Sequence, residues 1–180
     1  MKTTAKILFL LLLVGSIATG CKKLLDVEFD ADFKATMDVD VPATSLKADT
    51  YPFSDTYTID PATNSDYHKY ADKIVDVNLT GISGTITSVN PTGVHLLAGT
   101  VVEVSKAGFA TVAIFTTQSI PIAVGTTVTY NDTDGSFDAL DAIFKDQNPI
   151  TITYSGATDQ PGVTFTYELV FATTVTANPL

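Results

Sequence analysis

A run of acidic residues between positions 130 and 141, YNDTDGSFDALD, has the residue types and spacing that could bind a calcium ion. If Gly135 is placed at the glycine of a twelve-residue calcium loop, four aspartates fall on its third, fifth, ninth and twelfth positions. They are Asp132, Asp134, Asp138 and Asp141. Carboxylate oxygens are the ligands that calcium prefers. This run is therefore the candidate metal site, and calcium is the candidate cofactor.

A simpler interpretation of the same run is a polar turn followed by a helix. Tyr130 occupies the first loop position, where calcium loops have Asp, and Asp141 occupies the twelfth, where they have the longer Glu. The turn would pass through residues 134–135, and Ser136 would cap the helix. Asp138 would lie in the first turn, where the helix dipole favours an acid. We favour the turn and keep calcium as the alternative.

Histidine, the commonest general base, occurs only twice in the chain, at His68 and His95. His68 and Asp72 are four residues apart in a predicted helix, which could place two metal ligands on one face, but a solvated face is the more common arrangement. His95 falls in a predicted strand, where a local partner is expected. We predict that the protein is not an enzyme. A hydrolase with paired carboxylates is a further alternative, because the fold could bring together any two of twenty acids.

The first twenty residues have the three-part pattern of a secretory signal. Lys2 and Lys6 form a positive region, residues 7–14 are strongly apolar, and residues 15–20 are mostly small. A membrane-spanning helix needs about 20 apolar residues, more than residues 7–20 provide. We predict that residues 1–20 are removed as a signal peptide.

Cys21 follows this segment and is the only cysteine in the chain, so it has no partner for an internal disulfide. The stretch Ala18-Thr19-Gly20-Cys21 resembles the bacterial lipobox, with Ala18 where that motif prefers Leu. The continuation GCKK is similar to that of many Bacteroidota lipoproteins. The resemblance covers about 25 residues and implies that Cys21 is lipidated and becomes the mature N-terminus. An unmodified thiol after ordinary signal cleavage is the alternative.

The implied anchor places the protein in the cell envelope. Two or more acyl chains hold a protein stably on a membrane. Lys22 stands where an inner-membrane retention signal has Asp, so we expect the outer membrane. Residues 22–25 would be a short tether, and they differ from the acidic export signal of surface lipoproteins. Both the periplasmic and the exterior side of the outer membrane stay open.

The mature chain is strongly acidic and has the length of one domain. All ten basic residues are lysines, and two of them leave with the signal, so eight lysines face twenty acids and the formal charge becomes −12. Such a chain repels nucleic acid and anionic headgroups. It also lacks arginine, the Gly-Lys-Ser/Thr phosphate loop and the G-x-G-x-x-G fingerprint. We therefore exclude nucleic acid as a partner.

Strict alternation of apolar and polar residues predicts strands at both ends of the mature chain. Residues 26–41 alternate without a slip, and since sixteen residues would run to roughly 50 Å, we expect a break or an N-terminal tether. Residues 163–176 alternate in the same way. Seven further strands are predicted near residues 55–60, 74–80, 82–89, 94–104, 108–116, 122–130 and 149–155.

Two short helices interrupt these strands, one in SDYHKYADKI after a Ser65 cap and one in GSFDALDAIFKDQNP after a Ser136 cap. Each is expected to plug an open end of the fold. The stretch 65–86 also loosely resembles small flavobacterial lipoproteins, a likeness that implies no chemistry. The fold class predicted for residues 26–180 is one all-β domain: an antiparallel β-sandwich, Greek-key or jelly-roll-like, with eight or nine strands and two short helices.

These observations favour a lipid-anchored, non-enzymatic protein of the cell envelope. It would act as a structural or accessory subunit, or as a binding module, with an envelope protein or a glycan as its partner. The alternative is a calcium-assisted surface module that binds glycan or protein, and the second alternative is the carboxylate hydrolase.

Overall fold

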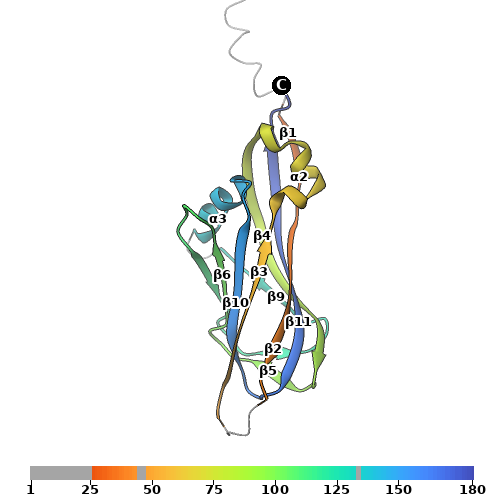
Figure 1. Ribbon diagram of the computed structural model, residues 1–180, viewed down its shortest axis with the longest axis vertical. Coiled ribbons are helices and arrows are strands. Elements are labelled where there is room, and N and C mark those ends of the chain that lie inside the picture. Colours follow the sequence, from red (N-terminus) through yellow and green to blue (C-terminus); the bar gives the residue numbers. More distant parts are fainter. Residues whose placement is uncertain (1–25, 44–47, 133–134) are drawn as a thin grey trace, which may run out of the picture.

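The structure, a computed structural model, describes residues 26–43, 48–132 and 135–180. These residues form two antiparallel β-sheets that pack face to face in an elongated sandwich (Figure 1). Cys21 and Asp134, two of the predicted site residues, lie outside the described residues.

The first sheet is built around the longest C-terminal strand. Its members are β1 (Val27–Asp30), β2 (Phe33–Val41), β4 (Ile74–Asn90), β9 (Thr127–Tyr130) and β11 (Val163–Ala177). Strand β11 pairs with β1 and β2 along one side and with β4 along the other, and β9 pairs with β4. Strand β9 is therefore one border of this sheet.

The second sheet is built around β10 (Ile150–Thr158). Its other members are β3 (Tyr51–Ile59), β5 (Val94–Leu96), β6 (Val101–Ser105), β7 (Val112–Phe115) and β8 (Ile120–Ile122). Strand β10 pairs with β3 on one side and with β6 and β5 on the other. Strand β7 pairs with β6, and β8 pairs with β5.

The predicted fold class, an antiparallel β-sandwich with two short helices, is confirmed. The described residues contain eleven strands, more than the eight or nine expected. The region 94–104 is divided into β5 and β6, the region around 122–130 contains β8 and β9, and the first alternating segment is divided into β1 and β2. Conversely, the segments 74–80 and 82–89 form the single strand β4.

The break expected in the first alternating segment lies between β1 and β2, at residues 31–32. Along β2 the exposure alternates at every residue, with Phe33, Met37 and Val41 among the buried side chains. Both strands pair with β11, which continues past the break. The long alternating segment therefore forms two strands, β1 and β2, that both pair with β11.

Strand β4 stays continuous at Gly81, the residue between the two strands predicted near 74–80 and 82–89. Its pairing with β11 shifts register three times, passing over Val75, Thr80 and Thr87. Such bulges place an extra residue on one strand, so that the strand bends without ending. The glycine near a bulge therefore marks a bend, and the sheet gains one long strand.

One cluster of buried side chains fills the space between the sheets. Aromatic rings join the two layers: Phe53 of β3 packs edge-on against Phe165 of β11, with 5.7 Å between ring centroids. The rings of Tyr154 and Tyr167 stack at 4.5 Å. Edge-on and stacked pairs add to the free energy gained from burying apolar area.

Both α-helices lie toward the same end of the sandwich, together with the C-terminus (Figure 1). They are α2 (Ser65–Lys69) and α3 (Ser136–Lys145), and the single turns η2 (Pro61–Thr63) and η3 (Ala71–Lys73) flank α2. Helix α3 buries Leu140, Ile143 and Phe144, as its apolar spacing predicts. It contacts β4 of one sheet and β7 of the other, so it closes the space between them at this end.

The predicted helix caps were wrong by one residue in both helices. Asn64, not Ser65, is the N-cap of α2, where its side chain accepts hydrogen bonds from two backbone N–H groups of the first turn, including that of Tyr67. Helix α3 begins after Gly135, whose positive φ of 77° turns the chain into the helix without a side-chain cap. Ser136 is then the first helical residue.

Candidate functional site

A groove lies open along one side of the sandwich, between the borders of the two sheets at β7 and β9. Its volume is about 520 Å³. One wall consists of residues 113–118 and Ile120, the other of residues 127–131, and Ser136 at the start of α3 lies at one end. Among the described residues that line it there is no Asp, Glu, Lys, Arg or His.

The opposite side of the sandwich is more closed, because β2 of the first sheet lies against β3 of the second. The hollow there has a volume of about 300 Å³ and includes the charged residues Asp32, Lys34 and Asp60 in its lining. The uncharged groove between β7 and β9 is thus the larger of the two and differs in chemistry from the rest of this acidic chain.

Neutral tyrosine hydroxyls lie behind the β9 wall of the groove. Tyr130 lines the groove and its Oη lies 3.0 Å from the Oη of Tyr167. Tyr154, stacked on Tyr167, has a buried hydroxyl without a hydrogen-bond partner among the described residues. Burial raises the pKa of Tyr130, Tyr154 and Tyr167 above the ordinary value. The wall therefore carries polar groups but no charge.

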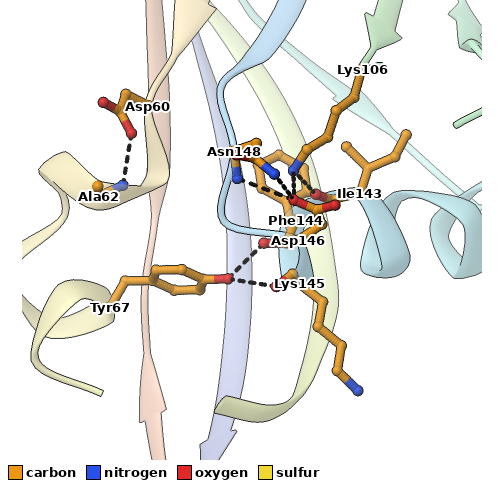
Figure 2. Close-up of polar contacts among 9 residues, drawn as sticks. All are labelled: Asp60, Ala62, Tyr67, Lys106, Ile143, Phe144, Lys145, Asp146 and Asn148. Atoms are coloured by element: carbon orange, nitrogen blue, oxygen red, sulfur yellow. Dashed lines mark hydrogen bonds and ion pairs between the residues drawn. The ribbon is translucent and has the colours of Figure 1, made fainter. Parts of the chain in front are cut away.

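A second polar cluster fixes the C-terminal end of α3 (Figure 2). The Nζ of Lys106, whose side chain is 2% exposed, donates to the carbonyl oxygen of Ile143 at 2.9 Å and lies 3.1 Å from Asp146 Oδ1. The hydroxyl of Tyr67 donates to the carbonyl oxygen of Phe144 at 2.6 Å. These donors satisfy carbonyls that a helix end leaves without partners. They anchor α3 and hence the end of the groove.

The protonation of this second cluster follows from burial and pairing. Burial lowers the pKa of the Lys106 ammonium, and the neighbouring Asp146 partly offsets that change. The pKa of Asp146 is lowered, first by the backbone N–H of Asn148 and then by Lys106. Burial raises the pKa of Tyr67 to about 12. These residues serve the packing of α3, since their polar atoms are already paired with one another or with the backbone.

The predicted calcium ligands are only partly brought together. Asp132 accepts long hydrogen bonds of 3.5 Å from the Ser136 hydroxyl and the Phe137 N–H, and Asp138 is exposed. Asp141 instead accepts a short hydrogen bond of 2.6 Å from the N–H of Leu79 in β4. Among residues 26–43, 48–132 and 135–180, no three His, Cys, Asp or Glu side chains are grouped to hold a metal ion.

The two histidines lie at opposite ends of the sandwich, since α2 carries His68 and β5 carries His95 (Figure 1). His68 is exposed, as is Asp72. His95 has the local partner that was expected: its Nδ1 lies 3.1 Å from Asp159 Oδ2, and its backbone N–H donates to Asp159 Oδ1 at 2.8 Å. The two imidazoles are therefore too far apart to act on one substrate.

Of the residues that line the groove, only Tyr130 and Ser136 were named from the sequence, and for other reasons. Phe115 is 58% exposed although it is a large apolar residue, and Ile120 and Val128 are half-buried. A signal was present nonetheless: between Asp76 and Asp132 the chain has only two formally charged residues, Glu103 and Lys106. Because the centres of protein interfaces are depleted of charged residues, this segment could have been identified as a candidate surface.

Among the residues that the structure describes, no helix is both long and apolar enough to cross a membrane. No family model and no curated protein matches the chain.

The chain is similar to solved structures from viruses. For the decameric BFDV capsid protein the TM-score is 0.45 at 8% identity, over 83% of this chain and 99% of that one. For turnip yellow mosaic virus the TM-score is 0.39 at 11% identity, over 86% and 95%. For desmodium yellow mottle tymovirus it is 0.35 at 13% identity, over 86% and 84%. TM-scores this low support no inference about shared function.

Proposed function

We propose that the protein is a lipid-anchored, non-enzymatic subunit of the cell envelope that binds a partner protein. The observation that carries this proposal is that the described domain begins and ends at the same end of the elongated sandwich. Asn178 donates to Asp26 Oδ1 at 3.1 Å, so the described domain begins beside its own C-terminal end. Strand β11 has fifteen residues and extends roughly 50 Å from that end. A lipid on Cys21, five residues before Asp26, would leave the sandwich projecting from the membrane.

The chemistry of the described residues supports a binding role over catalysis. The histidines lie at opposite ends, and His95 is engaged with Asp159. Asp141, which calcium would need, is engaged with the backbone of β4. The described lining of the groove between β7 and β9 is apolar and hydroxyl-bearing and contains no charged residue, which suits association better than acid–base chemistry.

The first experiment compares the full-length chain with Cys21→Ala in cells fed an alkyne analogue of palmitate. We expect the wild type to incorporate the label and to fractionate with the outer membrane. The Cys21→Ala variant should be unlabelled and released. Equal fractionation of both chains would refute the anchor.

The second experiment tests the binding role. Crosslinking in intact cells should join the wild type to one envelope protein in a fixed ratio, and Cys21→Ala should lose that product. Added protease should then report which side of the outer membrane the complex occupies. Turnover of a substrate by the purified domain, abolished by His68→Ala or His95→Ala, would overturn the non-enzymatic role.

A further inference from the structure

The two strands that border the groove lack the features that prevent strand edges from pairing. The other border strands do have such features. Strand β1 carries two acids, β2 carries Lys34 and other charged residues, β3 contains Pro52, and β8 contains Pro121. Charges and prolines at edges protect a sheet against unwanted strand addition. The sequences of β7 (VAIF) and β9 (TVTY) contain neither. Strands β7 and β9 are therefore open to pairing.

The register of β9 shows which of its backbone groups face outward. The N–H of Ile86 donates to the carbonyl oxygen of Thr126, and the carbonyl oxygen of Ile86 accepts from the N–H of Gly125, so a hydrogen-bonded position of the ladder lies at Ile86. Such pairs alternate along an antiparallel ladder, and the next ones join β4 to Val128 and Tyr130. Thr127 and Thr129 are in the pairs between, so their N–H and C=O groups point away from β4. They offer the hydrogen bonds that an added strand requires.

The charges on and near the groove indicate which kind of segment it would bind. The described lining is uncharged, whereas Asp132 and Asp138 are exposed; Asp132 accepts a hydrogen bond from the lining residue Ser136, and Asp138 follows Ser136 by two residues in α3. A second copy of this chain, with a mature formal charge of −12 (eight lysines against twenty acids), would be repelled. A neutral segment with a basic residue at one end would be attracted.

We propose that the groove binds an extended segment of the partner protein, which adds to the sheet as a strand paired with β9. Alternate apolar side chains of this segment would pack on Phe115, Ile120 and Val128 of the two walls. A lysine or arginine at one end would lie near Asp132 and Asp138. This inference rests on the proposed function, because it names the surface by which the anchored subunit holds its partner.

The direct test uses the purified domain, residues 22–180, and a short fluorescent peptide in which valine and threonine alternate between terminal lysines. Thr129→Pro removes an outward N–H, while the matched Thr129→Val keeps it. Phe115→Lys adds a charge to the groove at an exposed position where folding tolerates it, and Tyr57→Lys adds the same charge on β3 as a control. Fluorescence anisotropy measures affinity, and amide hydrogen exchange shows where the peptide binds.

Loss of one hydrogen bond or of the apolar contact should weaken peptide binding about tenfold in Thr129→Pro and Phe115→Lys. The Thr129→Val and Tyr57→Lys variants should stay within about twofold of the wild type. The peptide should slow exchange at the amides of Thr127 and Thr129 and leave those of Val128 and Tyr130 unchanged, because the latter two already bond to β4. No binding, or slowed exchange elsewhere, would overturn the groove assignment.

A photo-crosslinking residue at position 115 or 57 in intact cells separates this inference from the proposed function. Crosslinks from position 115 to an extended segment of an envelope protein support the strand addition. Crosslinks from position 57 alone leave the partner-binding function standing and overturn the groove assignment. Crosslinks between copies of this chain, with a dimer in ultracentrifugation that Phe115→Lys dissociates, overturn it in favour of self-association.

Discussion

Asp141 connects helix α3 to strand β4 through the 2.6 Å hydrogen bond from the Leu79 N–H. Asp141→Ala should lower the free energy of unfolding by roughly 1–3 kcal/mol, because it leaves that donor without an acceptor. Asp141→Asn keeps an oxygen in place and should lose far less. Denaturant unfolding with added calcium or a chelator measures both effects. Stabilisation of the wild type by calcium, abolished in Asp141→Ala, would instead support the calcium alternative.

The same carboxylate makes stability depend on pH. Burial raises the pKa of Asp141, the hydrogen bond from the Leu79 N–H partly offsets this rise, and the neighbouring Asp138 and Asp76 raise the pKa further. A folded pKa above the unfolded value means that the folded state holds the proton more tightly, so this stabilisation is present at low pH and is lost as pH rises from about 4. The unfolding free energy of Asp141→Asn relative to the wild type should therefore increase over that range, as urea titrations at several pH values would show.

Lys106 is the buried cation at the C-terminal end of α3 (Figure 2). Lys106→Met should cost roughly 1–3 kcal/mol of unfolding free energy, because the carbonyl of Ile143 loses its donor in a buried place. Lys145→Met is the matched control, since its Nζ lies 3.9 Å from Asp76 at the surface and such pairs contribute less than about 1 kcal/mol. Equal losses in the two variants would contradict a special role for Lys106.

At the scale of elements, strand β4 depends on one glycine. A Cβ on Gly84 would overlap the hydroxyl end of the Tyr167 ring, whereas a Cβ on Gly81, in the same strand, would meet nothing within 4 Å. Gly84→Ala should lower the unfolding free energy by about 1–3 kcal/mol or more through overpacking. Gly81→Ala should change it little. Thermal unfolding of the two variants measures the difference, and equal effects would show that Tyr167 moves aside at no cost.

The strands themselves were largely predictable, because alternation of apolar residues is a local property of a half-buried strand. Residues 33–41 and 163–177 alternate in burial as their sequence alternates in hydrophobicity. The caps and bulges were not predictable to the residue. Asn64 precedes Ser65, and Gly135 precedes Ser136, so each helix has two neighbouring residues at which it could begin. Only the path of the chain decides which residue of each pair is the N-cap.

At the scale of the whole molecule, buried tyrosines set the alkaline limit of the fold. Burial raises the pKa of Tyr67 to about 12 and raises those of Tyr130, Tyr154 and Tyr167. Because the unfolded chain ionises at about pH 10, the stability that these neutral hydroxyls contribute is present below that pH and declines above it. Tyrosine absorbance should therefore change together with unfolding, and Tyr67→Phe should make the decline shallower. Full ionisation of the folded protein would contradict this prediction.

The sequence alone determined the all-β class, the two helices and the buried face of each clear strand, since hydrophobic period and turn residues act over a few positions. The sequence also contained the resemblance to a lipobox at Cys21, because such a motif directs processing and does not depend on the fold. Tertiary structure decided everything that joins distant segments. It placed Asp141 against Leu79, Lys106 against the end of α3, and β7 opposite β9 across a groove whose described lining carries no charge. Such contacts depend on which strands become neighbours, and a local pattern does not specify the order of strands in a sheet.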